Sequence, residues 1–205
     1  MNILVRIKKH IINNLKAYLW VTMAFGVGIS VSFFSVFFMN DTQNSELLLY
    51  VNDFFDNIKT SGVDAKTLIK ISMTDSIKTC VLAFLFSLMI IGMPFLFALC
   101  GALGYTFGFS IFFMLKNFGF KALLFFCAAF LPHGMILLPS QMFFLAYCFN
   151  FVFAPSGYIK GTEKGKNVLG FFIVMLFVLM FCFGSSLISA YVEPWLISFI
   201  SKYYI

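Results

Sequence analysis

The sequence predicts an all-α polytopic integral membrane protein with about five transmembrane helices, some of them broken by proline and glycine or re-entrant. Of its 205 residues, 61% are hydrophobic and only 11% are charged, whereas soluble domains carry about 25% charged residues. Residues 79–115 and 122–159 contain no charged residue at all, and each run exceeds the roughly 20 residues of one membrane span. The whole chain, 1–205, is therefore interpreted as a single membrane domain without a separate soluble catalytic domain.

The amino-terminal part predicts an anchor with a cytoplasmic amino terminus. Residues 1–16 form a basic, partly amphipathic leader that can lie along the inner membrane surface. The positive-inside rule accounts for these basic residues, so the net charge of +6 does not require a nucleic-acid partner. The apolar run 17–39 is longer than the core of a signal peptide and no cleavage site follows it, so we expect it to remain as the first span.

Residues 40–78 form the predicted extracytoplasmic loop, which carries more acidic than basic side chains. Apolar residues recur there at helical spacing, which predicts an amphipathic helix that ends near Ser61-Gly62. The simpler interpretation is that its apolar stripe packs on the membrane or on the protein's own spans, and a partner contact is the alternative. The candidate docking residues are Leu47, Val51, Phe54 and Phe55, flanked by Asp53 and Asp56.

The uncharged run 79–115 is divided by Gly92-Met93-Pro94, where Gly92 and Pro94 interrupt a helix. We expect two passes of about 18 residues each. Gly101, Gly104 and Gly108 then share one helix face, which permits close approach of a neighbouring helix. Packing within one chain is the expected use of this face, and a seam between two copies of the chain is the alternative.

The run 122–159 contains Pro132, His133, Gly134 and Pro139. We expect a half-helix or re-entrant segment over 122–131 and a full span over 135–153. His133 is the only Asp, Glu, Lys, Arg or His residue of this run, and an ionisable group at membrane depth is a functional-site hypothesis. The interpretation that we favour is structural: a neutral imidazole bonds a carbonyl group that Pro132 leaves free.

The carboxyl-terminal part predicts a Gly-rich basic loop at 154–166, a last span at 168–190 and an interfacial aromatic segment at 191–195. Five crossings from a cytoplasmic amino terminus place the carboxyl terminus outside.

The sequence contains no motif that indicates catalysis. No HExxH or phosphate-binding loop is present, and no acidic residue lies inside a clear span. The five cysteines lie within apolar runs and read as buried small side chains. We therefore expect no enzyme activity, no cofactor and no metal site.

Three segments together resemble the stage II sporulation protein M family. They are Leu131-Pro132-His133-Gly134 with Leu138-Pro139, the Gly92-Met93-Pro94 break before a Gly-rich helix, and the terminal Ser189-Ala190-Tyr191-Val192-Glu193-Pro194. Many broader members carry a glutamate three residues after the motif glycine and another shortly before the closing Tyr-x-x-Pro. Leu137 and Ser189 stand at those places here. This departure argues against a proton- or ion-coupled His–Glu pair and favours a structural, sporulation-type member.

The resemblance implies a multi-pass protein of the cell membrane on the mother-cell side of the sporulation septum. It implies a non-enzymatic scaffold that recruits two peptidoglycan hydrolases, an amidase-endopeptidase and a lytic transglycosylase, for engulfment. Membrane lipids are further partners, and a homo-oligomer stays open. The alternative function is a channel or secondary transporter with a site at the Pro132-His133-Gly134 break, because transporters build their sites from broken helices.

Overall fold

The computed structural model describes residues 15–61, 65–89, 91–153 and 161–204, and within these ranges the chain is helical and contains no strand. The helices are α2 (Leu15–Phe37), α3 (Asp41–Ser61), α4 (Ala65–Leu88), α5 (Gly92–Phe118), α6 (Phe120–Phe153) and α7 (Gly161–Tyr204). Five segments are long and apolar enough to cross a membrane: Leu15–Phe37, Lys66–Leu88, Gly92–Phe118, Pro132–Val152 and Gly170–Glu193. The predicted fold class is confirmed. Most of the predicted leader, 1–14, lies outside the described residues.

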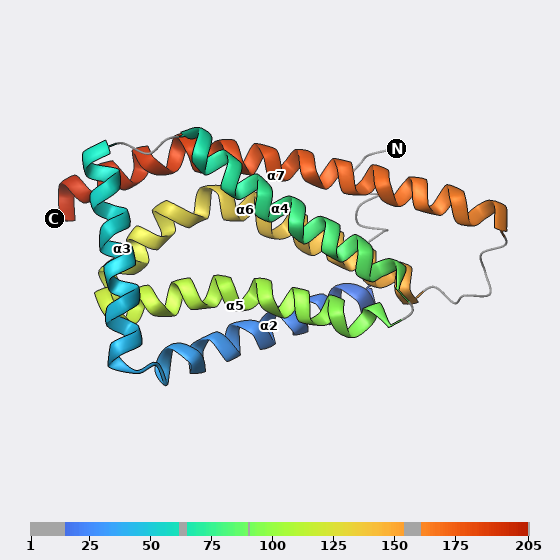
Figure 1. The fold of residues 1–205 in the computed structure, drawn as a ribbon, viewed down its shortest axis with the longest axis horizontal. Helices are drawn as coiled ribbons and strands as arrows, with labels where there is room; N and C mark the ends of the chain where they lie inside the picture. The colour runs from blue at the N-terminus through green and yellow to red at the C-terminus, as the bar shows by residue number, and fades with distance from the viewer. Residues whose placement is uncertain (1–14, 62–64, 90, 154–160, 205) are drawn as a thin grey trace.

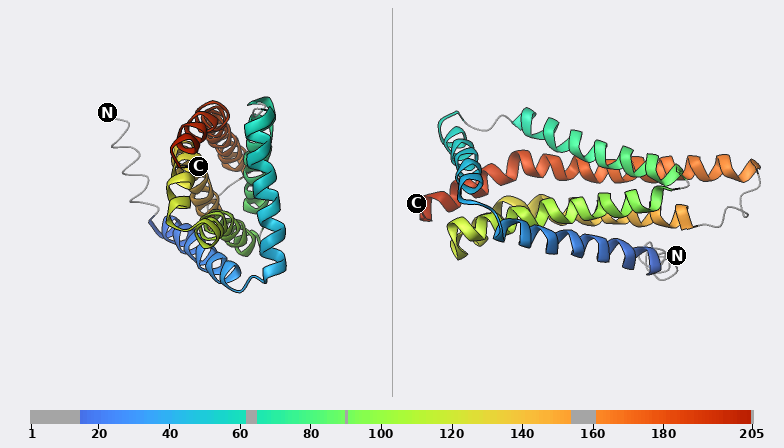
Figure 2. Two further views of the ribbon diagram at one scale, coloured as in Figure 1. Left: turned by 90° about the vertical axis from the view of Figure 1, so that its left-hand side faces the viewer. Right: turned by 60° about the horizontal axis from the view of Figure 1, so that its bottom comes forward.

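The helices α2, α4, α5, α6 and α7 form a bundle along the long axis of the molecule, while α3 lies across one end of it (Figures 1 and 2). At this end, which we call the α3 end, α2 and α5 finish, α4 and α6 begin, and α7 reaches its carboxyl terminus. The helices α2 and α7 begin at the opposite end, near the connection between α4 and α5. Successive spans therefore alternate in direction, as five consecutive membrane crossings require.

This arrangement allows a direct test of sidedness. Because α3 and the start of α7 lie at opposite ends of the bundle, we expect Asp53→Cys to react with an impermeant thiol reagent from outside the cell and Lys164→Cys not to react. The measurement uses a background that lacks the five native cysteines, and permeabilised cells serve as the control in which both positions label. Preferential labelling of position 164 in intact cells would reverse the predicted orientation.

The closest helix pair is α2 with α5, and glycines form the contact. A Cβ atom on Gly28 of α2 would overlap the carbonyl oxygen of Gly101, and one on Gly104 of α5 would overlap the carbonyl oxygen of Phe25. Gly108 is buried on the same face of α5. The glycine face that the sequence singles out thus packs within one chain, where the absence of side chains lets the two backbones touch.

Glycine also shapes the turns at both ends of α5. A Cβ atom on Gly92 would overlap the carbonyl oxygen of Phe86, so the α4–α5 turn fits only a glycine there. Pro94 falls in the first turn of α5, where its missing N–H group costs nothing. Gly119 has a φ of 68° and donates its N–H group to Leu115 O at 3.0 Å, which ends α5 directly before α6 begins.

The helix α6 corrects one expectation. The run 122–159 does not contain a half-helix or re-entrant segment followed by a separate span, because α6 is one helix of 34 residues with Pro132 and Pro139 inside it. Figure 1 shows that α6 bends instead of stopping. A proline in a helix removes one hydrogen bond and kinks the axis, and ending the helix would expose several more backbone groups to lipid. Residues 154–160 lie outside the described part.

A second correction concerns the predicted loop 40–78. Its first part forms α3, but α4 begins at Ala65, so the polar residues 65–78 belong to a helix that is long enough to span. No glycine or proline separates these residues from the apolar residues 79–88, and nothing therefore stops the helix between them. The last helix is likewise longer than expected, since α7 continues past 190 and through Pro194 to Tyr204.

The helices α4, α6 and α7 share an aromatic core. Phe171 of α7 is fully buried, and its ring centroid lies 5.1 to 5.6 Å from four others, those of Phe84, Phe144, Tyr147 and Phe151. Edge-on and tilted aromatic contacts of this kind stabilise beyond the area that they bury. The cysteines Cys80, Cys100, Cys148 and Cys182 are also buried and unbridged, as small apolar side chains are.

Candidate functional site

His133 of α6 and Glu193 of α7 form a buried pair near the α3 end of the bundle. Nδ1 of His133 contacts the carboxylate oxygen Oε1 of Glu193, and only 16% and 12% of the two side chains are exposed. Because a carboxylate oxygen only accepts hydrogen bonds, the imidazole is the donor in this contact. His133 is the second residue of the candidate span Pro132–Val152 and Glu193 is the last residue of Gly170–Glu193, so the pair lies where these two segments approach the α3 end.

Two serines of α7 complete the hydrogen bonding of this pair. Ser189 Oγ donates to Glu193 Oε2 at 2.8 Å, and Ser185 Oγ donates to the backbone carbonyl of His133 at 3.0 Å. The carboxylate thus has a partner on each oxygen, as a buried charged group requires. Neither serine hydroxyl donates to the imidazole, so this geometry differs from a nucleophile–base pair. The pair and its serines join α6 to α7.

The motif residues around His133 make room for this contact. Gly134 is buried, and a Cβ atom there would meet the ring of Phe130, so the missing side chain lets that ring lie over the helix. The Phe130 ring in turn lies edge-on to the imidazole, with centroids 4.9 Å apart. Pro132 is half-buried beside them, whereas Pro139 is exposed one turn or more away. Phe130, His133 and Gly134 therefore act as one packed unit.

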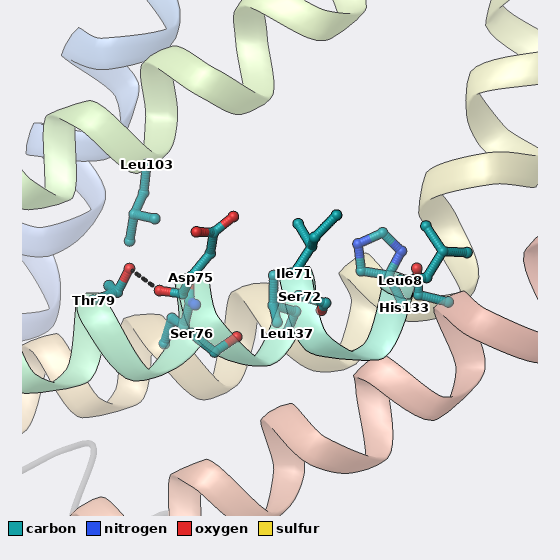
Figure 3. Close-up of a pocket in the computed structure, with 11 residues that line it drawn as sticks. Leu68, Ile71, Ser72, Asp75, Ser76, Thr79, Leu103, His133 and Leu137 are labelled. Atoms are coloured by element: carbon teal, nitrogen blue, oxygen red, sulfur yellow. Dashed lines mark hydrogen bonds between the residues drawn. The ribbon is translucent and has the colours of Figure 1, made fainter. Parts of the chain in front are cut away.

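A cavity of about 310 Å³ lies beside the pair, between α4, α5, α6 and α7 (Figure 3). Its walls combine apolar side chains with hydroxyl, amide, carboxylate and imidazole groups. The lining residues are Leu68, Ile71, Ser72, Asp75, Ser76, Thr79, Leu103, His133, Leu137, Gln141 and Ser189. Figure 3 shows Asp75 and Ile71 rising from α4 while Leu103 descends from α5. Polar groups of three helices thus share one hollow inside the bundle.

The hydrogen bonding of the cavity wall is incomplete. Gln141 is only 4% exposed, and its Oε1 atom is buried without a hydrogen-bond partner. Asp75 contacts the ammonium group of Lys78 at 3.5 Å, with both side chains more than half exposed. Among the described residues, no three His, Cys, Asp or Glu side chains form a group that could hold a metal ion. Among the described residues that line the cavity, Gln141 is therefore the one with a buried side-chain oxygen that lacks a donor.

Glu193 is the residue that the sequence interpretation missed. We expected His133 to bond a carbonyl group freed by Pro132, and this was wrong: the imidazole binds Glu193, and the His133 carbonyl accepts from Ser185. A signal was present, because buried or half-buried polar and small residues of α7 recur at helical spacing through Cys182, Ser186 and Ser189 to Glu193. Ending the predicted span at 190 removed the glutamate from that stripe.

The expected docking residues lie on α3, in two different settings. Leu47 and Val51 are half-buried on the side of α3 that bears Asn44, whereas Asp53 is exposed. The side chains of Phe54, Phe55 and Asp56 lie outside the described residues. The amides of Asn44 and Asn117 exchange two hydrogen bonds, at 2.8 and 3.0 Å, which ties the start of α3 to the end of α5. The opposite side of α3 exposes Leu49 and Tyr50 by 63% and 74%.

Comparison with known proteins identifies the family of this chain. The sequence model described as stage II sporulation protein M matches residues 21–194, which extend from within α2 to beyond Glu193. Comparison with curated proteins and with solved structures gives no match. The matched range includes the turns at both ends of α5, the motif around His133 and Glu193, which pairs with His133. The chain therefore belongs to the stage II sporulation protein M family, a family of sporulation membrane proteins.

Proposed function

We propose that this protein is a non-enzymatic scaffold in the cell membrane, on the mother-cell side of the sporulation septum. It recruits two peptidoglycan hydrolases, an amidase-endopeptidase and a lytic transglycosylase, for engulfment. Family membership supports the sporulation role. The observation that carries the scaffold role is α3, an amphipathic helix of 21 residues that lies across the end of the bundle and is anchored there by Asn44 and Asn117.

The outward side of α3 is the proposed docking face, and we define it as Glu46, Leu49, Tyr50 and Asp53, all exposed. A specific interface needs about 800 Å² from each partner, and the turn at Gly119 on the same end offers only one residue between α5 and α6. Exposed aromatic and aliphatic side chains provide the binding energy of such contacts. The acidic residues at its edge steer and orient a basic partner surface.

The docking face predicts a separable loss of recruitment. We expect Leu49→Asp with Tyr50→Asp to leave the protein inserted and abundant, since both side chains are exposed, and to abolish septal localisation of the hydrolases. Fluorescent fusions of both hydrolases in sporulating cells measure this, together with the membrane abundance of the variant. The matched control is Leu49→Met with Tyr50→Phe, which keeps the apolar surface and should recruit normally.

The other side of α3 defines the contrary outcome. Normal recruitment by the stable Leu49→Asp and Tyr50→Asp variant would exclude the outward face, and Phe54→Asp with Phe55→Asp then tests the apolar stripe named from the sequence. Recruitment that survives both double substitutions would exclude α3 and move the contact to the spans.

A channel or secondary transporter is the second candidate function, and the His133–Glu193 pair favours it. Sites for ions and protons in membrane proteins contain ionisable residues inside the bundle, and here two of them meet in the protein interior. The scaffold role predicts that proteoliposomes containing the purified protein leak protons and monovalent cations no faster than protein-free vesicles. Flux that His133→Asn abolishes would favour the transporter instead.

A further inference from the structure

The outward side of α4 carries charged residues inside a membrane span, at an edge of the bundle (Figure 2). Beyond the first turn of the candidate span Lys66–Leu88, all of its charged residues are exposed: Lys70, Asp75 and Lys78. Residues 17–37 of α2 and 170–192 of α7 contain no charged residue, so the outward faces of these spans suit lipid. Contact with lipid tails is too costly for charged groups, so the outward side of α4 requires water or protein instead.

The charged residues of α4 extend deep into the span. Asp75 lines the same cavity as Leu103, which is near the middle of α5, and as Gln141, which is near the middle of the span Pro132–Val152. The Asp75 side chain is 69% exposed, and the Lys78 side chain that contacts it at 3.5 Å is 66% exposed. A neighbouring helix with complementary charges satisfies such groups at a depth that lipid headgroups do not reach.

The exposed residues of α4 also follow the spacing of a coiled-coil seam. They recur at alternating intervals of three and four residues along one line of the helix, which is the a/d pattern by which two helices pack against each other. The six seam residues, all exposed, are Ile71, Thr74, Lys78, Val81, Leu85 and Leu88. The buried residues of α4 lie on the opposite side, toward the bundle: Ser76, Cys80, Ala83 and Ser87. Among the described helices, none therefore covers this seam.

We propose that the seam of α4 packs against the same seam of a second copy of this chain, as a parallel two-stranded coiled coil within the membrane. Two copies inserted with the same orientation are related by a two-fold axis along the bilayer normal, so their α4 helices run parallel. The a positions are then Ile71, Lys78 and Leu85, and the d positions are Thr74, Val81 and Leu88.

The charged flanks of the seam favour a second copy over an unrelated helix. Lys70 precedes an a position and is a g residue, while Asp75 follows a d position and is an e residue. In a parallel coiled coil, each g residue faces the e residue five positions further along the other helix, and opposite charges there form interhelical salt bridges. Lys70 of each copy thus faces the partner's Asp75, and the two-fold axis forms this pair twice. An unrelated helix would need an acid and a base at the two matching places.

Lys78 gives the seam a distinctive sign. A lysine at a single a position fixes the register and the number of strands, at a cost in stability. Its ammonium group contacts Asp75 of its own chain at 3.5 Å, which offsets part of that cost. We therefore expect Lys78→Leu to tighten self-association of the protein, although it removes a charged group from the contact. Weaker self-association of this variant would contradict the a position of Lys78.

The test uses the full-length protein in liposomes, with a donor or an acceptor fluorophore attached to the amino terminus of each copy. Energy transfer between copies is measured over a range of protein-to-lipid ratios, and unlabelled protein competes for the same contact. We expect the wild-type protein to self-associate. Lys70→Asp alone and Asp75→Lys alone should each weaken self-association by about tenfold or more, because each substitution places like charges across the seam.

A mixture of the two variants separates the seam from a loss of folding. Copies with Lys70→Asp present only acids at these two places and copies with Asp75→Lys present only bases, so the mixed pair recovers both salt bridges. Energy transfer should therefore be low within each variant and return to the wild-type level between them. Misfolded copies would not rescue each other in this way. Glu46→Lys, a charge reversal at an exposed position of α3, is the control and should self-associate like the wild-type protein.

Two outcomes would overturn the α4 seam. The first is energy transfer between wild-type copies that is no higher than random proximity in the bilayer produces. The second is energy transfer in the mixture that is no higher than within each variant alone. The seam does not rest on the scaffold role, because hydrolase recruitment is tested by substitutions on α3 and self-association by substitutions on α4. Failure of either experiment therefore leaves the other proposal intact.

Discussion

Replacing Gly28 with alanine is expected to separate α2 from α5 and to lower the free energy of unfolding by about 3 kcal/mol, the upper part of the range for overpacked positions. The added Cβ atom would overlap the Gly101 carbonyl oxygen and lie 2.9 Å from the Tyr105 backbone nitrogen. Both neighbours are backbone atoms of a helix and cannot rotate away. Only a shift of the whole α2 axis can relieve the overlap, and such a shift also loosens the other glycine contacts along α5.

The same helix provides the matched control for this substitution. Gly26 has no atom within 4 Å of its would-be Cβ, so Gly26→Ala should leave the free energy of unfolding unchanged or raise it by up to about 1 kcal/mol through reduced backbone entropy. Unfolding of the purified proteins in mixed micelles, followed by circular dichroism, measures both variants. Equal stability of Gly28→Ala and Gly26→Ala would show that α2 and α5 are not in backbone contact.

The sequence predicted one half of this helix contact and not the other. Gly101, Gly104 and Gly108 recur on one face, and that periodicity identifies a face for close packing without naming what it packs against. Gly28 belongs to the first span, where nothing in its local pattern sets it apart from Gly26. Its importance depends on how far α2 slides along α5, and that register is fixed by tertiary packing.

Span number was predictable and span limits were not. Uncharged length sets how many times the chain can cross a bilayer, and this gave five spans. The limits of α4 and α7 depend on whether a helix stops where its composition becomes polar. Neither helix stops there: α4 includes the polar stretch 66–78 with its charged side chains, and α7 continues through Pro194. The composition of a segment indicates which residues can contact lipid. A helix, however, ends only where its backbone hydrogen bonding is interrupted.

In the candidate site, the local motif could be predicted from the sequence, but the distant residue that pairs with it could not. Pro132, His133 and Gly134 were recognisable as an unusual local motif, and the packing of the half-buried Phe130 ring accounts for Gly134 and His133. The partner of His133 lies 60 residues further along the chain. Leu137 and Ser189 stand at the places where many members of the family carry a glutamate. Glu193, one helical turn beyond Ser189, supplies the carboxylate instead.

Breaking the His133–Glu193 pair is expected to destabilise the protein by about 3 kcal/mol for either single substitution, Glu193→Ala or His133→Ala. Each change leaves one buried polar group without its partner, and loss of Glu193 also leaves Ser189 without its acceptor. The double variant removes both groups together. It should therefore cost less than the sum of the single variants, with a coupling energy of about 1–3 kcal/mol.

A double-mutant cycle on unfolding free energies, measured in mixed micelles as for Gly28→Ala, gives this coupling directly. Ser189→Ala is the control, because it removes one hydrogen bond to the carboxylate and leaves the imidazole contact in place, so its cost should be only about 1 kcal/mol. Glu193→Gln retains a side chain of equal length and is expected to recover part of the stability that Glu193→Ala loses. Strictly additive costs for the two single substitutions would mean that His133 and Glu193 do not hold α6 and α7 together.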